Sequence, residues 1–371
     1  MKVVYITDAL AVWGGIERVL RDKMDYLVAH GYEVFVVTTD QGPHEIPYPL
    51  DCRIHVHDLG IQFHHQYRYH GVKRLAKYFE FGRLFRKRLK RIIKEITPDI
   101  LICIRPEALR DIVSVAGMIP VICESHSMFS AKHYERASFM YRLKLRFSLL
   151  KLSEISMLVA LTEGDANDWK RNCKNVCVIP NIVQLNDTDV YSDCLSKKVV
   201  FAGRFSRQKD IGSLFEIWKL VHKRHPDWDL NAYGEGEQWQ KYVELTKNAA
   251  INMYVYPPSP NIFDHYRESS ILLMTSLYEP FGLVLPEAMS CGLPVVAFNC
   301  PYGPADIITD GVDGFLIEGR DINAYADKVC LLIENVELRK KMGQAAILSA
   351  KRYDKTYIMP QWESLFKELV K

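Results

Sequence analysis

The sequence lacks several features that would set it apart from ordinary globular proteins. No stretch reaches the roughly 18 consecutive apolar residues of a membrane-spanning helix, and the apolar run at residues 3–7 meets Asp8 before it could form a secretory signal. The nine cysteines are scattered, several inside apolar runs, and none forms paired metal-binding spacing. We therefore expect free thiols, no zinc site and a cytoplasmic protein.

A strong excess of charge is also lacking. The formal net charge is +3, and no nucleic-acid partner is expected. Residues 60–100 depart from this balance, because eleven Lys and Arg, all within segment 68–94, oppose three acidic residues, 11 − 3 = +8. Apolar residues accompany these cations, as in a basic amphipathic helix. The segment favours peripheral binding at the inner face of the cytoplasmic membrane; the alternative is a solvated helix face packed on its domain.

The order of apolar runs predicts the fold class. A chain of 371 residues favours two domains. Apolar, strand-length runs alternate with amphipathic stretches, which is typical of parallel sheets made of βαβ units. The expected strands cover residues 3–7, 33–39, 100–104, 121–124, 157–162, 199–202, 229–233, 253–256, 271–275 and 294–298.

A repeated pattern predicts the domain organisation. The opening VVYITDALAVWGGIERVL is echoed by VVFAGRFSRQKDIGSLFEIW after residue 198, and each is a strand, a glycine-containing loop and a helix start. We expect two doubly wound α/β domains that face each other across a ligand cleft. Their predicted limits are residues 1–180, a polar linker at 181–197, residues 198–352, and a last helix at 353–371.

Two carboxylates eight positions apart form the most specific local pattern. Glu279 follows the strand at 271–275, and Glu287 lies in the helix that Leu283 opens. The turn at Pro280 and Gly282 leaves helical N–H groups that favour an anion. One carboxylate before the helix and one inside it could touch different parts of an extended ligand. A solvated pair is the alternative from spacing alone.

Basic residues follow the strand at 199–202. Arg204 offers a planar fork of donors and Lys209 a point charge, and together they suit a diphosphate. The dipole of the following helix would add to this effect. Two solvated cations on an exposed loop are an equally good interpretation.

Two further loops of the first domain are candidates. Gly14 and Gly15 permit close approach of a ligand to the backbone, although a structural turn explains them equally well. The G-x-G-x-x-G dinucleotide pattern is absent. His126 stands apart from the other histidines because it follows the strand at 121–124, where its side chain would point into the cleft.

Short acidic pairs give no convincing metal site. Asp187 and Asp189 lie in the expected linker, whereas Asp227 and Asp229 follow a His-Pro turn. Such pairs can hold a divalent cation, but solvated turn residues are the better interpretation. We therefore expect no metal and no cofactor.

Taken together, the motifs resemble the family-4 retaining glycosyltransferases of the GT-B fold. The resemblance covers nearly the whole chain, and the order and spacing of the motifs make it specific. The stretch from Cys300 to Ile308 is similar to a branch that moves galactose-type or glucose-type sugars in bacterial surface polysaccharide assembly. The matching motifs are Gly14-Gly15-Ile16-Glu17-Arg18, Ile179-Pro180-Asn181, Gly203-Arg204, Tyr233-Gly234-Glu235-Gly236, Glu279-Pro280-Phe281-Gly282, Cys291-Gly292-Leu293-Pro294 and Asp313-Gly314-Phe315.

The resemblance implies a role for each candidate residue. Arg204 and Lys209 would neutralise the diphosphate of a UDP-sugar, and Glu287 would bind the ribose. Glu279 and the backbone at Phe281, Gly282 and Leu283 would hold the sugar and phosphate. His126 would contact the transferred sugar. Gly15 would line the phosphate, and together with Gly14 it would also line the acceptor side. Asp210 stands where family members usually have glycine, which leaves the shape of that loop open.

The implied activity is transfer of a hexose or N-acetylhexosamine, with retention and without a metal, to a glycan acceptor that is lipid-linked. The last helix would cross back to the first domain with its apolar stripe. Two alternatives remain, a sugar-nucleotide epimerase of the same fold and a non-catalytic membrane-associated scaffold.

Overall fold

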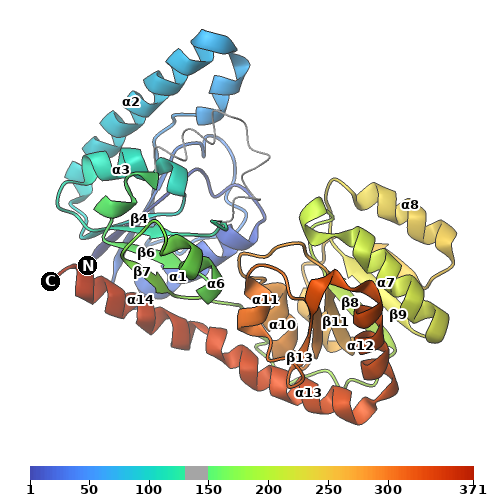
Figure 1. Ribbon diagram of the computed structural model, residues 1–371. Coiled ribbons are helices and arrows are strands. Elements are labelled where there is room, and N and C mark those ends of the chain that lie inside the picture. Colours follow the sequence, from blue (N-terminus) through green and yellow to red (C-terminus); the bar gives the residue numbers. More distant parts are fainter. Residues whose placement is uncertain (130–148) are drawn as a thin grey trace. The chain divides into compact units, whose positions relative to one another are not determined.

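The computed structural model describes residues 1–129 and 149–371, and these form two compact units (Figure 1). Unit 1 comprises Met1–Ile182 together with Ile358–Lys371, and unit 2 comprises Val183–Tyr357. Each unit contains one sheet in which every pairing is parallel. The predicted α/β class with two Rossmann-like sheets is confirmed.

The sheet of unit 1 has seven strands in the order β3-β2-β1-β4-β5-β6-β7. Its inner strands β4 and β5 are buried at every position, as expected for a parallel sheet with helices on both faces. The strands are β1 (Lys2–Thr7), β2 (Glu33–Thr38), β3 (His55–Asp58), β4 (Ile100–Cys103), β5 (Val121–Glu124), β6 (Met157–Ala160) and β7 (Val176–Val178).

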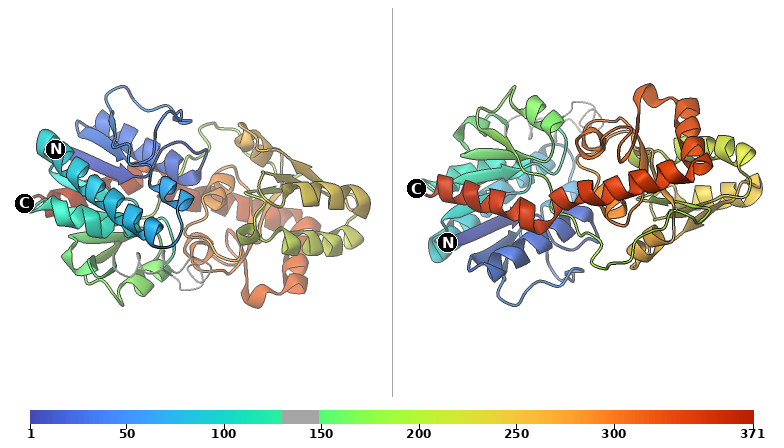
Figure 2. Two further views of the ribbon diagram at one scale, coloured as in Figure 1. Left: turned by 90° about the horizontal axis from the view of Figure 1, so that it is seen from above. Right: turned by 90° about the horizontal axis from the view of Figure 1, so that it is seen from below.

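Helices cover both faces of this sheet, and Figure 2 shows α2 and α14 on opposite faces of unit 1. Val4 and Ile6 of β1 pack in one core with Phe85 and Leu89 of α2. Among the described helices, none combines the length and apolar character needed to span a membrane. The helical segments are α1 (Gly15–Ala29), η1 (Phe63–Arg68), α2 (Gly71–Ile96), η2 (Pro106–Ala108), α3 (Leu109–Ala116), η3 (Leu152–Glu154), α6 (Glu163–Trp169) and α14 (Lys355–Leu369).

Unit 2 has six strands in the order β10-β9-β8-β11-β12-β13. Its core surrounds Trp218, which is completely buried. The strands are β8 (Lys198–Ala202), β9 (Asp229–Tyr233), β10 (Met253–Tyr256), β11 (Ile271–Met274), β12 (Val295–Phe298) and β13 (Gly314–Ile317). The helical segments are η4 (Arg207–Lys209), α7 (Ile211–Arg224), α8 (Trp239–Ala249), α9 (Ile262–Arg267), α10 (Val284–Ser290), α11 (Gly303–Ile307), η5 (Glu318–Arg320), α12 (Ile322–Glu334), α13 (Val336–Ala350) and η6 (Lys351–Tyr353).

All ten predicted strands are present, with small shifts at their ends. The sequence missed β3, β7 and β13, which lie at the edges of the two sheets. An edge strand buries less of its surface than an inner strand and therefore needs fewer apolar residues. The sequence of β3, His-Val-His-Asp, shows this clearly.

Residues 183–197 pack on unit 2 without forming a helix or strand. The N–H of Ser192 donates to the carbonyl of Cys291 at 2.8 Å, and the N–H of Asn186 donates to Ser290 Oγ at 2.9 Å. Cys194 is only 2% exposed. This segment is therefore attached to the helix α10 that carries Glu287.

Candidate active site

A lysine–glutamate pair lies at the carboxyl edge of the unit 2 sheet. Lys209 ends η4 after β8, and Glu279 follows β11, the strand paired with β8. The Nζ of Lys209 bonds Oε1 of Glu279, and Ser276 Oγ donates to the same oxygen at 2.6 Å. Glu279 is only 4% exposed. These contacts fix the direction of the carboxylate at the edge where α/β sheets bind their ligands.

The loop that carries Glu279 is held by the segment that follows β12. The N–H of Glu279 donates to the carbonyl of Pro301 at 2.7 Å, while the N–H groups of Tyr302 and Gly303 donate to the carbonyl of Glu279 at 2.8 and 3.0 Å. A Cβ atom at Gly303 would lie 1.6 Å from the carbonyl oxygen of Phe281. Only glycine therefore permits this close packing, which gives the Cys300–Gly303 stretch a structural role.

Several donors beside Glu279 suit an anion. The N–H groups of Phe281, Gly282 and Leu283 precede α10, and none of them donates a hydrogen bond to a described residue. Arg204 is exposed, and its guanidinium has no ion-pair partner in residues 1–129 and 149–371. Glu287 lies in the first turn of α10 and is 2% exposed. Six of the seven predicted donor-binding positions, all except Gly15, thus lie on the loop after β8, the loop after β11 and the first turn of α10.

Arg320 is a part of this site that the sequence did not reveal. Its guanidinium bonds the carboxylate of Asp210 and donates to the carbonyls of Thr275 at 3.0 Å and Ser276 at 2.9 Å. It thereby ties the loop after β8 to the end of β11. Asp210 has a left-handed backbone (φ 48°) and accepts the N–H of Ser213 at the start of α7. Left-handed geometry favours glycine, so Asp210 keeps the backbone shape that glycine would allow while adding a helix cap and an ion pair.

His126 in unit 1 lies beside a buried ion pair. The Nζ of Lys23 in α1 lies 2.7 Å from both carboxylate oxygens of Glu124, and both side chains are 1% exposed. The Nε2 of His126 lies 3.1 Å from Glu124 Oε1, which is close enough for an ion pair. The orientation of the ring does not make this contact a hydrogen bond. The carboxylate that ends β5 thus joins α1 to His126.

Burial and charge act in opposite directions on this cluster. Burial alone would raise the pKa of Glu124, but the charges of Lys23 and His126 offset it and lower the pKa to about 2. Burial lowers the pKa of Lys23, and Glu124 opposes this change. The Nζ of Lys23 also lies 3.4 Å from the ring centroid of Trp362 in α14. Glu124 therefore carries its negative charge at any working pH.

The loops around Gly14, Gly15 and His126 are ordered by different means. Gly14 caps α1 with an extended backbone, and Gly15 is its first residue. In the preceding loop the ring of Trp13 is 72% exposed. The loop after β5 is held by Asp165, which accepts the N–H of Phe129 at 3.0 Å. Burial raises the pKa of Asp165 to about 6, although its hydrogen bonds oppose this change.

Three of the four aspartates in the short acidic pairs are exposed, whereas Asp229 is half-buried and begins β9. Asp187 and Asp189 are exposed, and Asp227 pairs with Lys197 at 2.6 Å. Over residues 1–129 and 149–371 no group of three or more His, Cys, Asp or Glu side chains is arranged to hold a metal ion.

One signal for a missed residue was present in the sequence. Lys23 occupies a position of α1 that lies on its buried face, between Leu20 and Leu27. A lysine at such a position must find a buried partner. Arg320 gave no comparable signal, because it lies in the short polar segment η5, far from Asp210 in the sequence.

Two protein-family models match this chain, each over one part of it. The model of the family described as "Glycosyltransferase Family 4" matches residues 13–187, and the model described as "Glycosyl transferases group 1" matches residues 195–349. The chain is 28% identical to the amylovoran biosynthesis glycosyltransferase AmsD of Erwinia amylovora, over 98% of this chain and 99% of that protein. It is 27% identical to a poly(ribitol-phosphate) alpha-N-acetylglucosaminyltransferase of Staphylococcus aureus, over 75% and 57% of the two chains.

Solved structures share the fold over nearly the full length. The lipopolysaccharide outer core galactosyltransferase WaaB matches with a TM-score of 0.75 at 18% identity, covering 99% of this chain and 100% of that chain. Anabaena Alr3699/HepE, solved in complex with UDP, matches with a TM-score of 0.76 at 18% identity and the same coverage. The two units have the GT-B fold of these neighbours. The chain belongs to the family-4 glycosyltransferases.

Proposed function

We propose that this glycosyltransferase moves a galactose-type or glucose-type hexose or N-acetylhexosamine from a UDP-sugar to a lipid-linked glycan in bacterial surface polysaccharide synthesis. The contact of Lys209 with Glu279, beside Arg204 and the N–H groups at 281–283, carries this proposal. It combines cations for a diphosphate with a carboxylate for sugar hydroxyls. The amylovoran enzyme and the UDP-bound neighbours support the acceptor and donor classes.

The proposed reaction retains the anomeric configuration. The bond between the anomeric carbon and the phosphate oxygen breaks, and its electron pair stays on UDP. Arg204, Lys209 and the N–H groups of residues 281–283 stabilise this growing negative charge. The acceptor hydroxyl forms the new bond on the same face and gives its proton to the leaving phosphate. This route needs no protein nucleophile, unlike that of retaining glycosidases.

In this proposal each unit binds one substrate. Unit 2 binds the donor, with Glu287 on the ribose and Glu279 on the sugar. Unit 1 binds the acceptor near Gly14 and Gly15, while His126 contacts the transferred sugar and stabilises its developing positive charge. The fixed negative charge of Glu124 supports that electrostatic role of His126.

A screen of nucleotide sugars against lipid-linked acceptors tests the proposal. We expect release of UDP that depends on the acceptor, together with a new glycoside of retained configuration. Release of no UDP, with interconversion of the sugar nucleotide, would instead indicate an epimerase.

Metal dependence is a separate prediction of this mechanism. We expect turnover to persist in excess EDTA, because Arg204, Lys209 and backbone N–H groups perform the charge stabilisation that a cation could otherwise provide. Activity that disappears in EDTA and returns with Mn²⁺ or Mg²⁺ would contradict it.

A further inference from the structure

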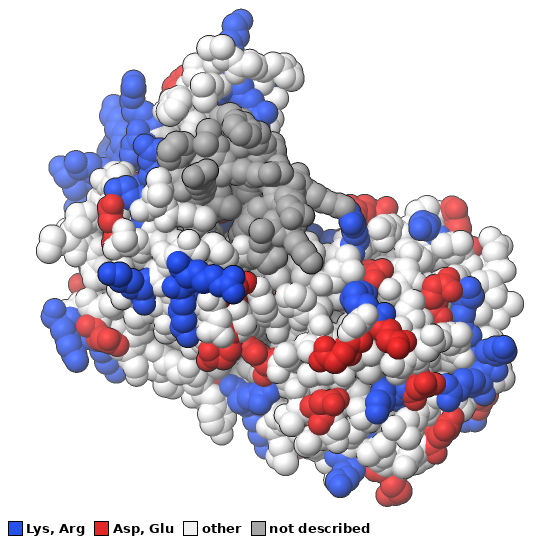
Figure 3. All heavy atoms as spheres, viewed as in Figure 1, with Lys and Arg blue, Asp and Glu red and all other residues white. Residues whose placement is uncertain are grey.

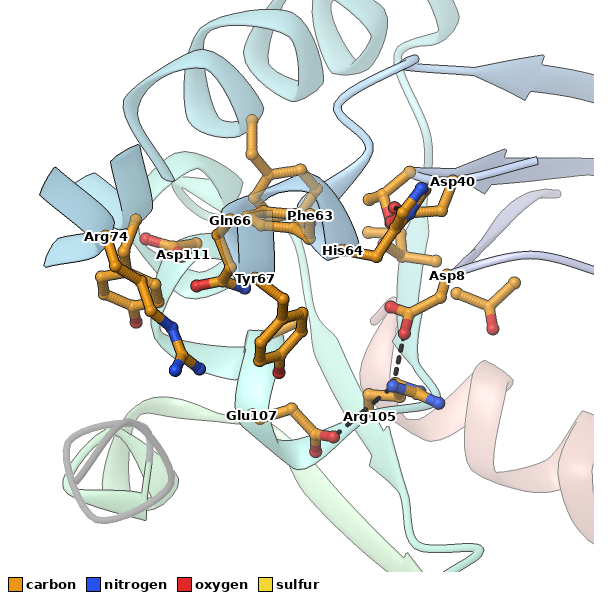
Figure 4. A pocket seen from close by; sticks show the side chains of 16 residues that line it. Asp8, Asp40, Phe63, His64, Gln66, Tyr67, Arg74, Arg105, Glu107 and Asp111 are labelled. Carbon is orange, nitrogen blue, oxygen red and sulfur yellow. Dashed lines mark hydrogen bonds and ion pairs between the residues drawn. The ribbon is translucent and has the colours of Figure 1, made fainter. Parts of the chain in front are cut away.

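Unit 1 contains a cavity of about 340 Å³ at the carboxyl end of its sheet. Residues that follow β1 and β2 form one side, and η1, the start of α2 and η2 form the others. The volume falls within the range of about 300–1,000 Å³ that is typical of small-molecule sites. Figure 4 shows the side chains that line it.

One wall of the cavity is aromatic. Phe63 of η1 packs edge-on against Phe85 of α2, with ring centroids 5.9 Å apart. Tyr67, also in η1, is 59% exposed, and the guanidinium of Arg74 lies 4.5 Å from its ring centroid. In Figure 4 the Tyr67 ring points from η1 toward Arg105 and Glu107. A partly exposed ring whose place is fixed by its own helix can stack on the C–H face of a sugar ring.

The opposite wall carries three carboxylates and one arginine. Arg105 pairs with Asp8 and, at 3.7 Å, with Glu107. Asp40 accepts hydrogen bonds from His64 Nδ1 at 2.9 Å and Thr39 Oγ1 at 2.6 Å. An ionised carboxylate offers about four lone-pair positions, so Asp40, which accepts two hydrogen bonds, can accept more from ligand hydroxyls. Carboxylates in excess of arginine on this wall disfavour an anionic ligand, and spare acceptors favour a ligand rich in hydroxyl groups.

The cavity is separate from the residues assigned to the reaction. Gly14, Gly15 and His126 do not line it. We propose that it binds a neutral sugar residue of the acceptor glycan, one or more positions away from the residue that is glycosylated. This inference rests on the proposed function and extends it, because the enzyme would then prefer acceptors longer than one sugar.

The test measures sugar binding to the full-length protein by saturation-transfer NMR. The probes are the neutral disaccharides lactose and maltose and an acidic disaccharide of glucuronic acid and N-acetylglucosamine. Tyr67→Ala and Asp40→Asn change opposite walls of the cavity. Tyr69→Ala is the matched control, because Tyr69 is also partly exposed, lies two positions away and does not line the cavity. UDP binding is measured in parallel by calorimetry.

We expect a neutral disaccharide to bind the wild type and the Tyr69→Ala control equally. Tyr67→Ala and Asp40→Asn should each weaken this binding by about tenfold, the loss of one stacking or hydrogen-bonding contact, while the affinity for UDP stays the same. The assignment would be overturned if the neutral disaccharides bound Tyr67→Ala as well as the wild type, or if neither of them bound the wild type. Tighter binding of the acidic disaccharide would also overturn it. If the wild type failed to bind UDP, the proposed function itself would be wrong, whatever the cavity does.

Discussion

Glu279 and Glu287 are both buried, but their surroundings differ. Glu279 contacts Lys209 and Ser276 at the end of β11, where the proposed transferred sugar would lie. Glu287 lies in the first turn of α10, where the proposed ribose would lie. A contact with the ribose is similar in the ground and transition states, whereas a carboxylate beside the anomeric carbon meets a charge that develops only during the reaction.

The two glutamates should therefore affect different kinetic constants. We expect Glu279→Gln to lower kcat by about 10²-fold or more, and Glu287→Gln mainly to raise the KM for the donor. Arg204→Ala should resemble Glu279→Gln, because the charge on the leaving group also grows during the step. Steady-state kinetics with varied donor concentration measures both constants.

A surface variant provides the control for these kinetics. Glu216→Gln on α7 removes only an exposed pair with Lys219 and should leave both constants unchanged. The assignment fails if Glu279→Gln changes only KM while Glu287→Gln abolishes turnover at saturating donor.

The Lys23–Glu124 pair predicts a pH-dependent stability. The pKa of Glu124 is about 2 in the folded protein and about 4.3 in an unfolded chain. Above about pH 5 the carboxylate is ionised in both states, and its contribution to stability is fully present. As the pH falls toward 2, the unfolded chain takes up the proton first and the contribution is lost. The difference between the two pKa values corresponds to about 3 kcal/mol.

Removing both charges should flatten this acid dependence. We expect the thermal unfolding midpoint of Lys23→Met/Glu124→Gln to fall less steeply than that of the wild type between about pH 5 and pH 2. The exposed pair Lys219 and Glu216 provides the control, and Lys219→Met/Glu216→Gln should keep the wild-type slope. Equal slopes for the wild type and the buried double variant would contradict the prediction.

The single variant separates the ion pair from simple packing. Glu124→Gln leaves the buried ammonium of Lys23 without its partner, which typically costs about 3–5 kcal/mol. The double variant should therefore be more stable than Glu124→Gln alone. A double variant that is less stable would show that the charges are not coupled in this way.

Individual site residues were predictable from the sequence where their position relative to a strand carries the information. Lys209, Glu279 and His126 follow strands, and topology directs such residues to the carboxyl edge of a sheet. Two buried or half-buried ion pairs around the site could not be predicted, because Lys23 and Glu124 are separated by 101 positions and Arg320 and Asp210 by 110. Such contacts depend on how helices pack on the sheet, and a single sequence does not specify this.

At the scale of elements, the inner strands were predictable because burial on both faces requires apolar side chains. The basic charges of α2 were evident from the sequence, but the residues at which the helix begins and ends were less so. Figure 3 shows Lys and Arg side chains gathered over α2. Some are paired locally, including Lys77 with Glu80, Arg86 with Asp111 and Arg91 with Glu95.

The exposed face of α2 carries apolar and basic side chains together. Val72 is 84% and Phe79 59% exposed, and Lys87, Lys90 and Lys94 are exposed one turn apart along the helix. We propose that this face binds an anionic membrane surface, where each cation contributes about 1 kcal/mol before screening. The apolar side chains would insert at the headgroup boundary.

Flotation with liposomes tests this surface. We expect the protein to float with anionic liposomes at low salt and much less with neutral ones. Lys87→Glu/Lys90→Glu/Lys94→Glu should abolish flotation, whereas Lys340→Glu/Lys341→Glu on α13 should not. Equal flotation of the wild type with neutral and anionic liposomes would contradict the membrane role and favour a solvated helix face.

At the scale of the whole molecule, unit 1 is made of two separate parts of the chain. Its sheet and helices end at Ile182, but α14 returns to it from Ile358 onward. Trp362 is 1% exposed and covers the ammonium of Lys23, while Phe366 contacts Tyr32 at a ring-centroid distance of 6.1 Å. The last helix therefore completes the face of unit 1 that contains the Lys23–Glu124 pair.

This discontinuity predicts how fragments behave. Residues 1–182 alone should be poorly soluble or unfold at a lower temperature than the same residues joined to 355–371 by a long Gly/Ser linker, because the first fragment exposes the surface that α14 covers. Trp362→Ala in the fused fragment should remove much of the increase in unfolding temperature, since truncating a buried tryptophan costs about 3–5 kcal/mol of stability. Tyr357→Ala is the matched control, because Tyr357 is 61% exposed. The measurement is the thermal unfolding midpoint followed by circular dichroism, and equal midpoints for the two fragments would show that unit 1 does not depend on its last helix.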